Sequence, residues 1–147
     1  MGYALFAQKK LVLCGMLNTV QMQQSQRSDE QLRLATRSLS LKNRISSLQS
    51  AQSSVLADLY EKLSSASDSS VRDDINTQIQ SKENEFDGEI EKLNRQVNDT
   101  SNKENAIEME VKRLDTKVTA LQKQLDALQE AEGNGIDKST PKFKGVG

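Results

Sequence analysis

Apolar residues recur at intervals of three and four between Ile79 and Leu128, which is the pattern of a coiled-coil helix. In heptad notation, the a positions are Ile90, Val97, Val111, Val118 and Leu125, and the d positions are Ile79, Phe86, Leu93, Ile107, Leu114, Leu121 and Leu128. Polar residues interrupt the pattern at Glu83, Thr100 and Glu104, but the apolar residues on both sides stay in phase. The pattern therefore predicts one continuous helix over residues 71–132.

A second helical pattern covers residues 27–63, and a serine-rich stretch separates it from the first. Its apolar positions again step by three, four or seven: Leu34, Leu41, Ile45, Leu48, Val55, Leu59 and Leu63. Residues 64–70 hold poor helix formers and come just before Asp73 and Asp74, which suit the first turn of a helix, so we expect the turn there. Two glycines flank Asn134 and predict a helix stop, with residues 133–147 as an extended tail.

The two helical stretches have matching lengths, which suggests that the chain folds back on itself near residue 67. Facing residues should then have numbers that sum to roughly 134, and this register pairs Arg27 with Glu104. The predicted fold is all-α, a long antiparallel two-helix coiled-coil hairpin with an extended C-terminal tail; a parallel dimer of the 71–132 helix is the alternative. The expected hairpin seam comprises Leu41, Ile45, Leu48, Val55, Leu59, Ile79, Phe86, Ile90 and Leu93.

Residues 1–26 form the apolar end of the chain, where the stretch 11–17 is apolar on nearly all sides of a helix. One partner helix cannot cover such a segment, so we expect other copies of the chain to cover it. The expected self-assembly interface comprises Phe6, Leu11, Val12, Leu13, Gly15, Met16, Leu17, Val20, Leu114, Val118, Leu121, Leu125 and Leu128. Gly15 either lets a neighbouring helix approach closely or breaks a short terminal helix. Residues 11–26 carry no charge, but this stretch is too short and too polar for a transmembrane helix. No cleavable signal peptide is evident.

The composition of the chain argues against metal binding and catalysis. Histidine is absent, Cys14 is the only cysteine and aromatic residues make up 3% of the chain, so the sequence predicts no metal site, no cofactor, no catalytic constellation and no enzyme. Residues 1–70 carry eight Lys/Arg against five Asp/Glu, and residues 71–132 carry nine against fifteen. These opposite charges suit the two helices as partners, and neither is clustered enough to predict nucleic-acid binding. The carboxylates between residues 83 and 91 are interpreted as a solvated helix face.

Residues 51–65, with the sequence AQSSVLADLYEKLSS, resemble the N-terminal segment of bacterial flagellins in their Ser/Gln-rich start, their acidic-basic pair and their Leu-Ser-Ser end. The predicted plan of the chain, in which apolar terminal helices pair with each other and a more polar hairpin lies beyond them, also resembles that of flagellins and of the filament proteins of type III secretion systems. The resemblance implies a secreted, extracellular or cell-surface subunit whose terminal helices line a filament core.

Two function hypotheses follow from these patterns. The first is a self-assembling coiled-coil structural protein, a filament or sheath subunit that polymerises with itself through its apolar terminal helices. The alternative is a coiled-coil adaptor or chaperone-like hairpin that docks its apolar end on another protein or on a membrane surface, and of these two contacts the membrane is the less favoured.

Overall fold

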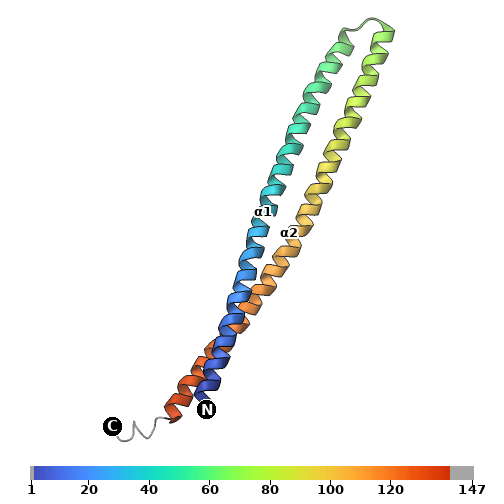
Figure 1. Cartoon of the computed structure of the whole chain (residues 1–147). Coiled ribbons are helices and arrows are strands. Elements are labelled where there is room, and N and C mark those ends of the chain that lie inside the picture. Colours follow the sequence, from blue (N-terminus) through green and yellow to red (C-terminus); the bar gives the residue numbers. More distant parts are fainter. Residues whose placement is uncertain (1, 140–147) are drawn as a thin grey trace. The chain divides into compact units, whose positions relative to one another are not determined.

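The computed structural model describes residues 2–139, with side chains described from residue 4 to residue 133. Within this range the chain forms two helices, α1 (Gly2–Ser65) and α2 (Ser69–Ser139), which a short connection joins (Figure 1). The two helices pack against each other and no strand occurs among the described residues. The expected all-α helical hairpin is confirmed.

A single helix, α1, contains both the expected terminal segment 1–26 and the expected arm 27–63. One row of its buried and half-buried positions steps by four and three without interruption from Phe6 to Leu59. They are Phe6, Lys10, Leu13, Leu17, Val20, Gln24, Arg27, Gln31, Leu34, Ser38, Leu41, Ile45, Leu48, Gln52, Val55 and Leu59. Because polar residues fill several of these seam positions, the apolar pattern of the sequence showed only part of the repeat.

In α2 the heptad frame read from the sequence is confirmed. Every a and d position from Ile79 to Leu128 is buried or half-buried, including the three polar ones at Glu83, Thr100 and Glu104. Thr100 is only 4% exposed, and its hydroxyl donates a hydrogen bond to the carbonyl oxygen of Gln96 at 2.8 Å, one turn earlier in α2. This internal bond satisfies the buried Thr100 hydroxyl, so α2 continues through this polar seam position.

The connection between the helices is shorter than the expected turn at residues 64–70, because only residues 66–68 are not helical. The carboxylate of Asp68 accepts a hydrogen bond from the amide of Ser70 at 3.0 Å, and its carbonyl oxygen accepts one from the amide of Arg72 at 3.0 Å. Asp68 is therefore the N-cap of α2. Arg72 also donates to the carbonyl oxygen of Ala66 at 3.4 Å, next to the end of α1.

The helix stop expected at residues 133–135 is wrong, because α2 runs on to Ser139. A glycine ends a helix when it adopts a left-handed conformation, and no glycine among the described residues has a positive φ. A glycine in ordinary helical geometry costs only about 1 kcal/mol, which does not stop a helix by itself. The rest of the expected tail, residues 140–147, lies outside the described residues.

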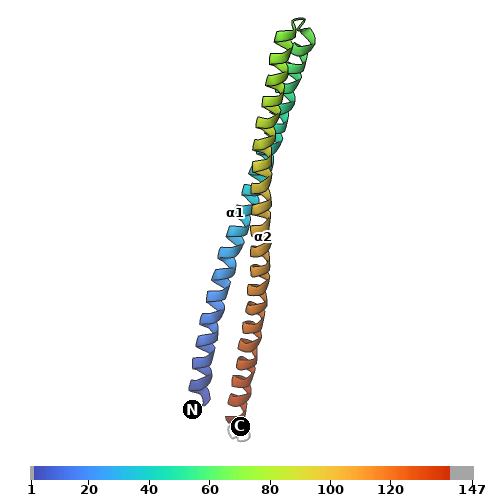
Figure 2. The ribbon, with the colours of Figure 1, turned by 90° about the vertical axis from the view of Figure 1, so that its right-hand side faces the viewer.

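The chain divides into two compact units, each containing a stretch of both helices. We call Met1–Gln31 with Ala106–Gly147 the terminal unit, and Leu32–Asn105 the turn unit. Within the terminal unit the two helices run side by side (Figure 2). In the turn unit, Leu59, Ile75 and Ile79 form a buried cluster, with Val55, Leu56, Leu63 and Ala66 packed around it.

All nine expected hairpin-seam residues lie in the turn unit, and none of them is exposed. Leu41, Leu59, Ile79 and Leu93 are buried. The remaining five are half-buried: Ile45, Leu48, Val55, Phe86 and Ile90.

Candidate functional site

A buried cluster between α1 and α2 forms the core of the terminal unit. It comprises Leu17, Val20, Leu114, Leu121 and Leu125, with Leu13, Cys14 and Val118 packed against it. Seven of the residues assigned from sequence to self-assembly are thus covered within one chain, because α1 presents them to the seam of α2. Phe6 and Leu128 are half-buried.

The other predicted assembly residues are not covered by α2. Leu11 is 75% exposed, Val12 55% and Met16 44%, and Gly15 is exposed as well. The structure adds Leu5, which is 52% exposed and which the sequence analysis did not select. Its signal was its spacing, since Leu5 lies seven residues before Val12 and therefore on the same side of the helix. The candidate site is this group of uncovered apolar residues on α1.

A groove of about 760 Å³ lies between the two helices beside these residues. Leu5, Lys9 and Val12 of α1 line one side, and Gln124, Ala127 and Ala131 of α2 line the other. Gln8, Leu13 and Leu128 complete the lining. Most of these side chains are apolar or small, so the groove suits another apolar helix better than a polar small molecule.

A second hollow of about 480 Å³ runs along α1, where Gly15 lies among Val12, Met16 and Val20, and Lys117 of α2 flanks it. A Cβ atom added at Gly15 would meet nothing within 4 Å. Packing within this chain therefore does not require glycine at this position, and the helix passes through it unbroken. The interpretation of Gly15 as a helix break is wrong.

A band of polar residues lies on the seam of the terminal unit. The Arg27 guanidinium donates to Glu30 at 2.7 Å and to Glu110 of α2 at 3.1 Å, and the Gln24 amide donates to Asp115 at 3.3 Å. The hydrogen bond to Glu30 and the negative charge of Glu110 raise the pKa of Arg27 above its usual value, so this cation stays charged at any ordinary pH.

The pairing of Arg27 with Glu104 expected from the register is wrong, since Arg27 bonds Glu110 instead. The physical reason is the register of the two helices: the residue numbers sum to 137 for Arg27 with Glu110 and to 139 for Gln24 with Asp115, so Arg27 lies level with Glu110 and not with Glu104.

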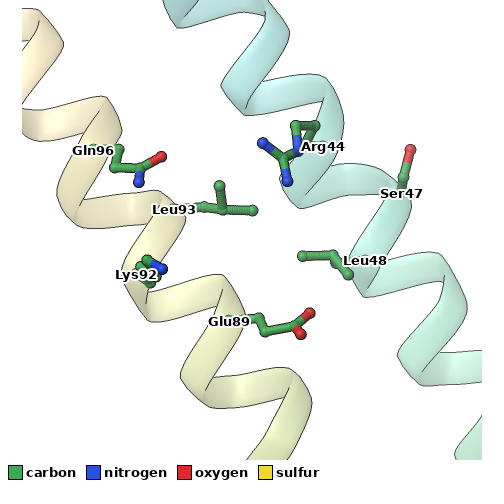
Figure 3. Close-up of a pocket in the computed structure, with 7 residues that line it drawn as sticks. All are labelled: Arg44, Ser47, Leu48, Glu89, Lys92, Leu93 and Gln96. Carbon is green, nitrogen blue, oxygen red and sulfur yellow. The ribbon is translucent and has the colours of Figure 1, made fainter.

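The turn unit has a polar hollow of about 470 Å³ (Figure 3). Leu48 of α1 and Leu93 of α2 extend into the space between the helices, with Arg44 and Glu89 to either side. No ion pair joins Arg44 to Glu89 among the described contacts, and the hollow is open to solvent. It lacks the converging buried polar groups of a ligand site.

The described residues hold neither a group of three or more side chains able to bind a metal ion nor a helix with the length and hydropathy to cross a membrane. The Cys14 side chain is half-buried and packs against the seam cluster of the terminal unit. Its place is that of a small apolar residue.

Comparisons of the chain with protein-family models, with curated proteins and with solved structures gave no match.

Proposed function

We propose that this protein is a structural subunit that assembles with itself through the terminal unit, forming filaments or a sheath. The observation that supports the proposal is the set of exposed apolar side chains on α1 at Leu5, Leu11, Val12 and Met16. Covering each of them removes apolar surface from water, which contributes about 1.5–3 kcal/mol for a side chain that becomes fully buried.

The positions of these side chains favour growth beyond a dimer. Leu11 and Val12 are consecutive residues of a helix, so they point about 100° apart around its axis. Val12 lines the groove between the helices, whereas Leu11 does not. A symmetric contact made through one surface closes on itself, and a polymer needs a second surface. The terminal unit offers two, one on each side of α1.

The resemblance of residues 51–65 to flagellins agrees with this proposal and suggests that the subunit acts outside the cell or at its surface. The heptad seam supports the same function, because a coiled-coil repeat suits a structural building block better than a catalytic one.

The proposal is tested with two matched double variants. Leu11→Glu with Val12→Glu places charges on both exposed surfaces of the terminal unit. Leu32→Glu with Leu39→Glu makes the same chemical change at two exposed leucines of the turn unit, which are 69% and 61% exposed. Neither pair touches a seam position, so circular dichroism should show unchanged helix content in both.

The expected result is that the terminal variant stays monomeric in light scattering and forms no polymers in negative-stain electron microscopy. The turn-unit variant should assemble like the unmodified chain. Assembly of both variants to the same extent would refute the terminal unit as the interface.

A further inference from the structure

The groove of the terminal unit has two walls that each repeat every seven residues. On α1 the wall follows Leu5, Lys9 and Val12, a second run with steps of four and three that lies beside the seam residues Phe6 to Leu13. On α2 it follows Gln124, Ala127 and Ala131, which lie beside the seam residues Leu125 and Leu128. A heptad repeat on both walls fits a helix packed with knobs in holes.

The two walls differ in the size of their side chains. The α1 wall carries the large residues Leu5 and Val12, whereas two of the three residues on the α2 wall are alanines. Val12 of α1 and Gln124 of α2 line this same groove from opposite helices, as do Leu5 and Ala131. Large side chains of α1 therefore lie level with small side chains of α2 along the groove.

The walls also differ in charge. Lys9 of α1 is the only charged residue that lines the groove, and the lining residues of α2 are uncharged. A contact between the α1 walls of two copies would bring like charges together. A contact between α1 of one copy and α2 of the other avoids this repulsion and sets large side chains against small ones.

We infer that the groove binds the same groove of a second copy, so that α1 of each copy packs against α2 of the other in a two-fold symmetric four-helix bundle. In such an isologous contact the pairing of an α1 wall with an α2 wall occurs twice. The inference rests on the proposed function and deepens it, because it assigns the first contact of assembly to this groove and leaves Leu11, on the other side of α1, for growth beyond the dimer.

The first test compares Ala127→Glu with Ala106→Glu. Both alanines are exposed, lie on α2 of the terminal unit and occupy the same heptad position, but only Ala127 lines the groove. A carboxylate buried at position 127 should weaken dimer formation by about tenfold or more in analytical ultracentrifugation. The same change at position 106 should leave the dissociation constant within about twofold.

The second test identifies the contact by cross-linking. In a Cys14→Ala background, chains carrying Val12→Cys and separately tagged chains carrying Gln124→Cys are mixed and oxidised. Disulfides between the two kinds of chain are expected to dominate over those within each kind. Leu11→Cys chains mixed with Gln124→Cys chains serve as the control and should form fewer mixed disulfides, because Leu11 lies outside the groove.

The outcomes separate this inference from the proposed function. If the unmodified chain associates but Ala127→Glu has no more effect than Ala106→Glu, or if the mixed disulfides do not exceed the control, the groove contact is wrong while self-assembly stands. If the unmodified chain is monomeric at every concentration, both are wrong. If another protein's helix occupies the groove, the cross-links between copies will be absent, which also overturns the inference.

Discussion

Replacing Glu104 by leucine should stabilise the hairpin. Glu104 occupies an a position of α2 and is half-buried, and its Oε1 atom is shielded from solvent with no hydrogen-bond partner among the described residues. A buried polar atom without a partner costs about 1–3 kcal/mol. Glu104→Leu removes this cost and places an apolar side chain in line with the a-position residues Val97 and Val111, and the helix propensities of the two residues are nearly equal.

Because Glu104 is only half-buried, we expect the lower part of that range, an increase of about 1–2 kcal/mol in the free energy of unfolding. The measurement is urea denaturation followed by circular dichroism at the helical band. It is made in the Leu11→Glu, Val12→Glu background, so that association does not add to the apparent stability.

Glu61→Leu is the matched control, because Glu61 is an exposed residue of the same turn unit. Its stability should stay within about 0.5 kcal/mol of the parent. An unchanged or lower stability for Glu104→Leu would show that the Glu104 carboxylate contributes favourably to the seam, and the reasoning from its unpartnered oxygen would be refuted.

Two further predictions concern the cap and the glycines. Asp68→Ala should lower the free energy of unfolding by about 0.5–2 kcal/mol by removing the N-cap of α2, whereas Asp68→Asn should retain most of the stability; an equal loss in both variants would contradict the capping role. In the same monomeric background, Gly15→Ala and Gly88→Ala should each raise the stability by about 0.5–1 kcal/mol, since neither added Cβ meets an atom within 4 Å. In the assembling chain only Gly15→Ala should weaken association, as measured by sedimentation, because we expect a neighbouring copy to approach α1 at this residue; equal behaviour of the two variants would remove Gly15 from the interface.

The heptad frame of α2 was predictable because a period of 3.5 over many turns leaves few alternatives to a coiled coil. It held at Thr100 and Glu104 as well, since the phase of the neighbouring apolar residues decides which side of the helix is covered. The seam of α1 was only partly predictable, because some of its positions hold polar residues that a pattern of apolar residues does not reveal. These include Lys10, Gln24, Arg27 and Gln52.

The candidate site was harder to predict than the fold. The sequence shows that residues 11–17 are apolar on most sides, but it does not show which side α2 covers. Leu17 therefore looks no different in sequence from Leu11, although the seam buries Leu17 and leaves Leu11 75% exposed. The groove between Val12 and Gln124 depends on the register of the two helices. A shift of a few residues in this register would place other side chains opposite each other.

The end of α2 shows a limit of local signals. Two glycines around Asn134 are a common helix stop, yet the helix includes them. A glycine permits the left-handed conformation of a C-terminal cap without enforcing it.

The most direct test of self-assembly is the mass of the unmodified chain in solution across a concentration series, measured by light scattering, with electron microscopy of the same samples. The account predicts that the mass rises with concentration beyond that of a dimer and that extended polymers are visible. A constant mass of a monomer or small oligomer at every concentration, with no polymers, would contradict it.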